Sequence, residues 1–249
     1  MRSHRFPFLA ALILICAVSI HARDTTRELV VDLKFLPQEG VHSSSADLTS
    51  SMIEHPVSLL IEDERGGADA MVIGEGTNDD DHRFPIRADD DVIGYVTDTL
   101  HDVAEKWGLT LDRRADRVLK LRLTRFSVDE DNKPVGSVYT AEARLGFVLT
   151  DAGGRVLAEG AASGVAHRYG RARSEDNCNE VLSDALQEAF ANVLTDARVR
   201  SAWGAGERER ESRSERTEQR LRRLEDLYRK KLITRDEYEQ KRAEILRGL

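Results

Sequence analysis

The sequence predicts an α+β fold, an antiparallel sheet with two helices on one face, followed by a C-terminal helical hairpin. Residues 139–149 alternate apolar and polar side chains, which is typical of a long half-buried strand. Residues 92–107 and 177–198 repeat apolar side chains every three or four positions, which is typical of amphipathic helices. Residues 221–249 show this helical spacing twice, so the helical hairpin is predicted there.

The first half of the chain contains two predicted strands and one helix. Residues 27–36 alternate in the manner of a strand, and residues 57–61 form a short apolar run typical of a buried strand. A helix is predicted from Val92 to Trp107. The carboxylates of Asp89–Asp91 favour its N-terminus, and Gly108 is typical of its end.

Three consecutive antiparallel strands and a helix are predicted next. Residues 119–123 and 139–149 alternate, the sequence DAGG at Asp151–Gly154 is typical of a hairpin turn, and residues 156–165 return. The helix over 177–198 carries a broad apolar face suited to lying on the sheet. Small residues on these strands predict a close approach of the helices: Ala141, Ala143, Gly160 and Gly164.

The C-terminal segment encodes two short amphipathic helices joined by a tight turn. Thr234–Glu237 reads TRDE, a capping box in which the threonine hydroxyl accepts from the Glu237 amide and the glutamate returns to the Thr234 amide. The second helix is therefore expected to begin at Arg235. The apolar stripes are Leu221, Leu224, Leu227 and Tyr228 on the first helix, and Tyr238, Ile245, Leu246 and Leu249 on the second.

Residues 221–249 resemble the SHOCT family of short C-terminal domains. The pattern shared with that family is two leucine-spaced turns, an L-I-T turn, an acidic-aromatic pair and a K/R-x-x-[IL]-L ending. The resemblance implies an interaction or oligomerisation module appended to unrelated domains, and it implies no chemistry.

Size favours association of this helical pair. Below about 40 residues a core rarely offsets chain entropy without a metal, a disulfide or a partner. The apolar stripes therefore need a second surface. Self-association or another envelope protein would supply it, and the alternative is that the stripes pack on the chain's own main domain.

Residues 57–199 resemble the YajG family of bacterial envelope lipoproteins. The likeness rests on the helix ending at Trp107-Gly108-Leu109, the alternating strands around the DAGG turn, and the helix closing with residues 193–196, VLTD. The resemblance implies a fold and an envelope compartment, and the family is without an established catalytic activity. The chain departs from the family in its terminal helical pair and in the residue before Cys16, which is Ile rather than a small residue.

Residues 1–22 predict a secretory signal. Basic residues precede an apolar run from Phe6 to Ile20, and that run is short for a membrane span. Cleavage after Ala22 gives a periplasmic or secreted protein. Lipidation at Cys16, the disfavoured alternative, would attach the chain to the membrane, and an uncleaved anchor is disfavoured further. After cleavage at Ala22 one cysteine remains, Cys178, either buried in a helix or a reactive thiol.

The charge of the chain is divided unequally. Residues 23–206 contain 21 Lys and Arg against 34 Asp and Glu, a balance of −13, which argues against nucleic-acid binding. Residues 207–223 alternate in sign, as in a charged helix or a flexible linker. Glycines after Trp203 predict a helix end there. The expected organisation is a signal (1–22), an α+β domain (23–203), a charged linker or helix (204–220) and a helical hairpin (221–249).

Motifs for catalysis, a cofactor or a metal are not recognisable in the sequence. The aspartate runs lack the spacing of a calcium loop, the histidines are scattered, and phosphate-binding and nucleophile motifs are missing. One basic segment follows the last predicted strand, and a loop is predicted there at His167. Guanidinium groups suit anions, so the segment is a candidate anion contact through Arg168, Arg171 and Arg173.

The sequence therefore predicts an exported, non-catalytic envelope protein that acts by protein–protein interaction or oligomerisation through its C-terminal helical hairpin. Two alternatives stay open. One is an envelope hydrolase whose residues converge only in space. The other is a ligand-binding module for an anionic component of the envelope.

Overall fold

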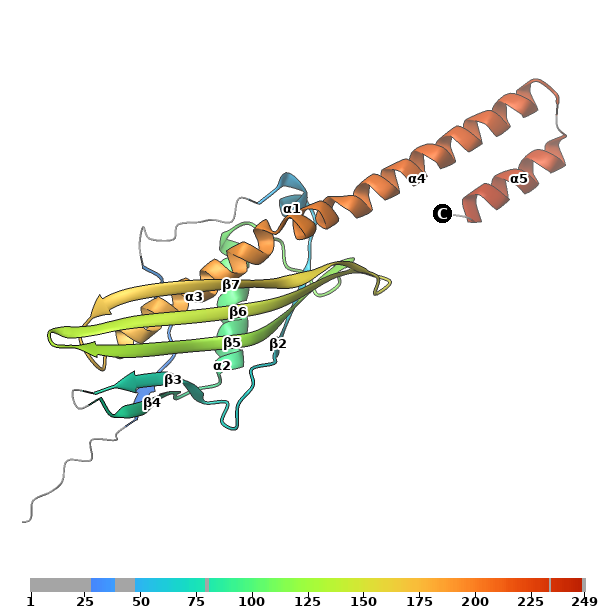
Figure 1. The fold of residues 1–249 in the computed structure, drawn as a ribbon. Helices are drawn as coiled ribbons and strands as arrows, with labels where there is room; N and C mark the ends of the chain where they lie inside the picture. Colours follow the sequence, from blue (N-terminus) through green and yellow to red (C-terminus); the bar gives the residue numbers. More distant parts are fainter. Residues whose placement is uncertain (1–27, 39–47, 79–80, 233, 248–249) are drawn as a thin grey trace, which may run out of the picture.

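The computed structural model describes residues 28–38, 48–78, 81–232 and 234–247, and for 204–214 it describes the backbone alone. The fold is α+β, as predicted, with a long helix that leads away from the sheet to the terminal hairpin (Figure 1). The elements in chain order are β1 (Leu29–Val31), α1 (Ser50–Glu54), β2 (Ser58–Asp63), β3 (Val72–Thr77), β4 (Arg83–Ala88), α2 (Val92–Lys106), β5 (Arg117–Lys133), β6 (Gly136–Asp151), β7 (Val156–Gly170), α3 (Glu175–Thr195), α4 (Ala197–Arg229) and α5 (Arg235–Arg247).

The sheet contains parallel pairs beside the predicted antiparallel ones. Its strands run in the order β1-β4-β3-β5-β6-β7, and β2 also pairs with β5. β1 lies parallel to β4, and both β2 and β3 lie parallel to β5. The parallel pairs arise because β5, with 17 residues, takes β2 along its first half and β3 along its second. The chain between β2 and β5 contains α2, as parallel crossovers usually require a helix.

β3 and β4 form a hairpin that the sequence did not predict. β3 contains two glycines, which are poor strand formers, and the acidic run at 79–81 that follows is typical of a loop. Gly74 permits the pairing with β5, because a Cβ at this position would lie 1.7 Å from the carbonyl oxygen of Val128. β3 therefore depends on a close approach between two backbone segments, which local strand propensities do not predict.

The three-stranded ribbon of β5, β6 and β7 confirms the predicted alternation. Leu121 of β5 lies opposite Phe147 of β6, and both are fully buried on the helix-covered face. A register shift between Leu123 and Arg125 lets β5 turn new apolar residues inward further along. The other face carries ion pairs such as Lys120 with Glu62 at 2.7 Å, so this face of the ribbon is polar.

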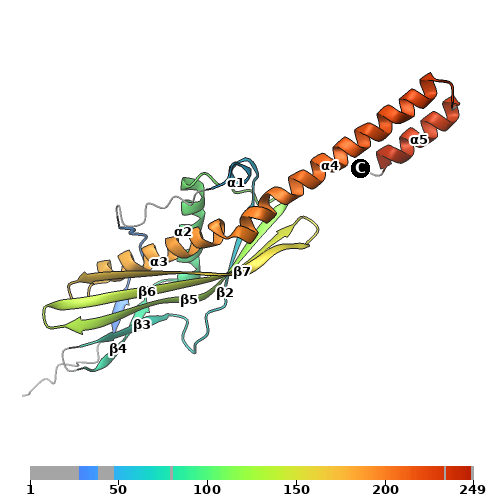
Figure 2. The same cartoon turned by 45° about the horizontal axis from the view of Figure 1, so that its top comes forward.

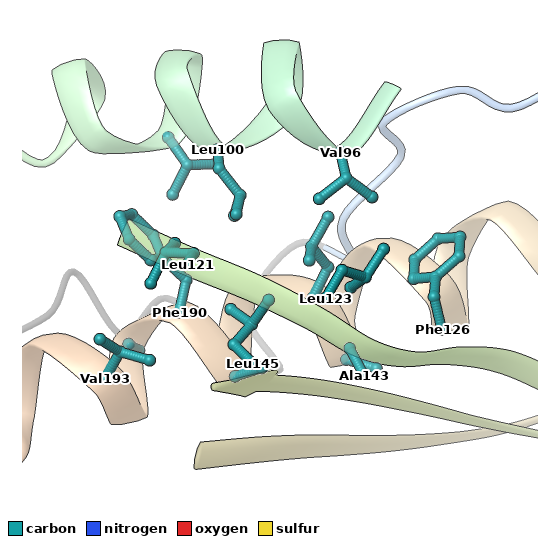
Figure 3. Close-up of a cluster of buried hydrophobic side chains, with 14 of the residues drawn as sticks. Val96, Leu100, Leu121, Leu123, Phe126, Ala143, Leu145, Phe190 and Val193 are labelled. Atoms are coloured by element: carbon teal, nitrogen blue, oxygen red, sulfur yellow. The ribbon is translucent and has the colours of Figure 1, made fainter. Parts of the chain in front are cut away.

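α2 and α3 cover one face of the ribbon, as predicted, and enclose one apolar core (Figure 3). Leu100 of α2 lies over Leu121, Val96 lies over Leu123, and Phe190 of α3 lies beside Leu121. Trp107, at the end of α2, stacks on Phe190 with ring centroids 5.6 Å apart. The predicted caps of α2 are also confirmed, with Asp91 accepting from the Ile93 amide at 3.1 Å and Gly108 at φ 92°.

The strand predicted over residues 27–36 is shortened to β1. Beyond it, residues 32–38 run extended along α3 and bond to helix side chains instead of to a strand. These side chains satisfy backbone groups that a neighbouring strand would otherwise pair. The bonds join Lys34 N–H to Asn179 Oδ1 (3.1 Å), Asn179 Nδ2 to the Asp32 carbonyl (2.9 Å), Leu36 N–H to Ser183 Oγ (2.9 Å) and Gln38 N–H to Asp184 Oδ1 (2.9 Å).

The helix end predicted at the glycines after Trp203 is wrong. α3 stops at Thr195, and α4 begins at once, with Asp196 accepting from the Arg198 amide at 2.8 Å. α4 then runs through Gly204 and Gly206 to Arg229, so the segment for which a helix or a flexible linker was open is helical in backbone. Each helical glycine costs about 1 kcal/mol. Trp203 is 0% exposed in the body, and its burial stabilises the start of α4 and offsets the cost of the glycines.

Candidate interaction surface

The C-terminal hairpin consists of the second half of α4 and the whole of α5. Both views show it projecting away from the sheet at the end of α4 (Figures 1 and 2). In these views α5 lies alongside α4 and folds back toward the body without reaching it. The hairpin surface is therefore open along its length.

The turn of the hairpin is closed by hydrogen bonds on both sides. On the α4 side the Leu232 amide donates to the Leu227 carbonyl at 3.0 Å and the Lys231 amide to the Tyr228 carbonyl at 2.9 Å, the two bonds of a Schellman motif. Lys231 adopts φ 55° there, a left-handed conformation that glycine usually supplies. The turn thus holds its shape without a glycine.

The predicted capping box starts α5 at Arg235, which confirms both expectations. The Thr234 amide donates to Glu237 Oε2 at 2.8 Å, and the Glu237 amide donates to Thr234 Oγ1 at 3.3 Å. The bond from the Thr234 amide, followed by that from its hydroxyl, lowers the pKa of the Glu237 carboxyl. The box therefore stabilises the first turn of α5 with the carboxylate form of Glu237.

The two apolar stripes face each other but cover each other incompletely. Leu224 is buried, at 8% exposure, and the rings of Tyr228 and Tyr238 meet across the helices with centroids 4.9 Å apart. Tyr228 and Leu246 remain 41% exposed, and α5 has no buried residue. Half-buried side chains complete what we call the seam: Leu221, Leu227, Tyr238 and Ile245. Leu249, predicted for the same stripe, lies outside the described residues.

A groove of about 210 Å³ runs between the helices at the seam. Leu224, Leu227 and Ile245 form its apolar floor, and its rim carries arginines from α4 and the Lys241–Glu244 ion pair of α5 (2.8 Å). Packed interiors leave few voids of this size. An apolar groove bordered by charge is the form of surface into which a side chain from another helix can insert.

The basic segment after the last predicted strand is part of that strand. β7 continues to Gly170, so the loop predicted at His167 is wrong, and pairing with β6 extends to Ser137 opposite Gly170. His167 faces Thr140 of β6, with its Nδ1 3.0 Å from the threonine hydroxyl. The strand ends at Gly170, and the turn before α3 lies at Ala172 and Arg173.

The three arginines proposed for an anion do not converge. Arg168 forms an ion pair with Glu180 of α3, and the Arg173 guanidinium lies over the Phe84 ring, 4.3 Å from its centroid. The Arg171 side chain is exposed. Two of the three guanidinium groups are thus engaged within the chain, and the anion contact stays a prediction.

A buried polar cluster fastens the far end of the ribbon to the start of α3, and the sequence did not predict it. Glu130 is 2% exposed, and its Oε1 accepts from the Ser137 hydroxyl at 2.8 Å and the Arg173 amide at 2.7 Å. The Tyr139 hydroxyl accepts from the Ser174 amide at 2.9 Å, and burial raises the pKa of Tyr139. Ser137 and Glu130 are both closed to solvent, so this serine–carboxylate pair lies within the packed interior.

Cys178 lies buried in α3, as the first of its two interpretations predicted. Burial raises the pKa of the thiol, and the nearby Glu130 carboxylate raises it further. The thiolate, which is the reactive form, is therefore disfavoured. Across the described ranges, no cluster of three or more His, Cys, Asp or Glu side chains is placed to hold a metal ion.

No protein-family model and no curated protein matches this sequence. Solved structures with some likeness include a DUF330 protein from Xanthomonas campestris, at 14% identity and TM-score 0.42, covering 74% of this chain and 99% of its own. A minor lipoprotein from Acinetobacter baumannii matches at 12% identity and TM-score 0.34, covering 57% and 92%. A lipoprotein from Neisseria meningitidis matches at 14% and TM-score 0.24, covering 45% and 84%. These names include no enzyme, and at such scores no function passes from them to this chain.

None of the helices in the described residues combines the length and the hydropathy that a bilayer crossing requires.

Proposed function

We propose that this chain is an exported protein of the bacterial cell envelope that acts by protein–protein association through the seam of its C-terminal hairpin. The observation that carries the proposal is the open seam itself. The hairpin projects away from the body, Tyr228 and Leu246 are each 41% exposed, and a groove lies between the two helices at the seam.

The energetics of the hairpin support an association role. Among the described residues of the hairpin, Leu224 is the one buried apolar side chain, so the contact between α5 and the end of α4 removes little apolar surface from water. Burial contributes about 25 cal/mol per Å² of apolar surface, against an ordering cost of roughly 1.5 kcal/mol per residue. Covering the seam with a second apolar surface adds burial without ordering a new chain segment.

A second copy of the chain is the partner that we propose. Soluble homo-oligomers are most often two-fold dimers, in which the same patch pairs with itself. α4 extends 26 residues beyond Trp203 (229 minus 203), about 40 Å of helix, so two hairpins can pair while the acidic bodies stay apart. The resulting arrangement is a four-helix bundle with the seams inside.

Charged substitutions in the seam test this proposal. Changing Leu221 and Leu246 together to glutamate is expected to raise the dissociation constant about 100-fold or more, because an unpaired buried charge costs several kcal/mol. The readout is the molar mass from light scattering across a dilution series.

A matched control adds the same charge on the opposite faces of the same helices. Gln219→Glu with Gln240→Glu should leave the mass as in the unaltered chain, since both positions are exposed and lie away from the seam. Equal masses for the seam variant and the unaltered chain at every concentration would contradict self-association through the seam. A heterologous envelope partner would then remain the alternative occupant.

The envelope location rests on the sequence. Residues 1–22 have the pattern of a secretory signal, and they lie outside the described residues. The proposal takes cleavage after Ala22 as the route, with lipidation at Cys16 as the alternative. Both routes place the folded chain beyond the inner membrane.

A further inference from the structure

The turn between α4 and α5 concentrates positive charge at the outermost point of the molecule. In the sequence, residues 229–235 read RKKLITR, with four basic and no acidic side chains. We call the described members Arg229, Lys230, Lys231, Leu232 and Arg235 the basic tip. Arg229 pairs with Asp226 and Arg235 with Glu239. Within the described part of the chain, Lys230 and Lys231 form no ion pair, and both are exposed.

An apolar side chain lies among these charges. Leu232 is 66% exposed, more than any seam residue, and it stands next to the two lysines at the end of the hairpin. An exposed leucine beside unpaired ammonium groups has no partner surface in the fold. The combination suits a surface that is anionic at its boundary and apolar just beneath, such as a lipid bilayer.

The backbone at Lys231 is a second, independent observation. Its φ of 55° places a residue with a Cβ in the left-handed region, which is sterically disfavoured. The same position in a Schellman motif is usually glycine. The turn thus carries a charged side chain at a position where glycine would be free of strain.

The charge distribution of the whole chain fits the same surface. The body over residues 23–206 carries a balance of −13 and would be repelled by anionic lipid. α4 holds the basic tip about 40 Å beyond Trp203, and the Debye length at physiological ionic strength is about 8 Å. The repulsion of the body is therefore screened while the tip makes contact.

We propose that the basic tip binds the anionic headgroups of a membrane surface, with Leu232 inserted at the interface. The contact is peripheral and reversible, and it requires no lipid on Cys16. It uses the end of the hairpin and leaves the seam free, so it stands independently of the association proposed above.

Vesicle binding tests this inference. The chain beginning at Arg23 is used, because residues 1–22 contain an apolar run that would itself enter a bilayer. It should sediment with vesicles that contain phosphatidylglycerol and not with vesicles of phosphatidylcholine alone. Binding should be lost at 1 M salt, where the Debye length falls to about 3 Å.

Two variants at the tip separate charge from stability. Lys230→Gln with Lys231→Gln should weaken partition to phosphatidylglycerol vesicles about 25-fold, at about fivefold per lysine. Lys231→Gly should raise the melting temperature of the hairpin helices, because glycine relieves the left-handed strain, yet weaken partition about fivefold. A higher melting temperature together with weaker vesicle binding would show that Lys231 contacts lipid rather than stabilising the turn.

The control removes the same charge elsewhere on the hairpin. Arg242→Gln with Arg247→Gln, both exposed and distant from the turn, should leave partition within about twofold of the unaltered chain. Failure of the unaltered chain to bind phosphatidylglycerol vesicles would overturn the inference. Equal losses in the tip variant and this control would overturn it as well. The tip variants should keep the molar mass of the unaltered chain, so this outcome is separate from that for the seam.

Discussion

Replacing Gly164 by alanine is expected to lower the free energy of unfolding by about 3 kcal/mol, at the upper end of the usual cost of overpacking. Gly164 lies in β7 beneath α3. A Cβ there would lie 2.1 Å from the carbonyl oxygen of Ala185 and 2.5 Å from the amide nitrogen of Ala189. Both are backbone atoms of a helix, so no side-chain rotation relieves the clash and α3 itself must move.

Urea unfolding of the Gly164→Ala variant measures this cost, and Gly66→Ala is the control. A Cβ at Gly66 meets no atom within 4 Å, and its stability should change by less than about 1 kcal/mol. If the Gly164 variant unfolds at the midpoint of the unaltered chain with an unchanged slope, the close packing of α3 on β7 is contradicted.

Trp203→Ala is expected to cost about 4 kcal/mol, within the range for large aromatic side chains in a core. Trp203 is fully buried and is the largest such side chain in the described residues. It lies in the second turn of α4, so its loss also removes the contact that fixes the direction of the long helix. The readout is the free energy of unfolding of the body. It is measured by circular dichroism, which does not depend on tryptophan fluorescence.

Two variants make the result at Trp203 specific. Trp203→Phe keeps most of the volume and should cost less than about 1.5 kcal/mol, the range for similar hydrophobic exchanges. Val135→Ala, at an 88% exposed hairpin position, should be neutral. Similar stabilities for the alanine and phenylalanine variants would mean that the indole makes few packing contacts. That result would contradict the conclusion that burial of Trp203 fixes the start of α4.

The elements that the sequence predicts well have local determinants. The alternation over 139–149 identifies β6, and Asp91 with its flanking carboxylates identifies the start of α2. The capping box of Thr234 and Glu237 likewise fixes the start of α5 to the residue. In each case the hydrogen bonds or the apolar face join residues that are close in sequence.

The elements that the sequence does not predict depend on distant partners. Residues 32–38 form hydrogen bonds to side chains of α3 that are about 145 positions away, and no local pattern of residues predicts these bonds. β3 forms because Gly74 allows an approach to Val128. α4 passes through its glycines because Trp203 is buried in the body. In all three, tertiary contact outweighs local propensity.

The seam likewise has features that the local sequence predicts and features that depend on how the two helices pack. The stripes follow from spacing within each helix, and their described residues lie along the contact between α4 and α5. The groove depends on how Leu224 and Leu227 of α4 are placed relative to Ile245 of α5, a register between helices that the sequence does not specify. The left-handed conformation of Lys231 is also not predicted, because sequence patterns for turns depend on glycine, asparagine or proline.

The most direct test of the association account is sedimentation equilibrium of two chains, residues 23–249 and residues 23–206. The second chain keeps Trp203 and the body but lacks the hairpin, and circular dichroism checks that the body remains folded. The account predicts the mass of a dimer or larger for the first chain at micromolar concentration and that of a single chain for the second. The same single-chain mass for both would contradict it.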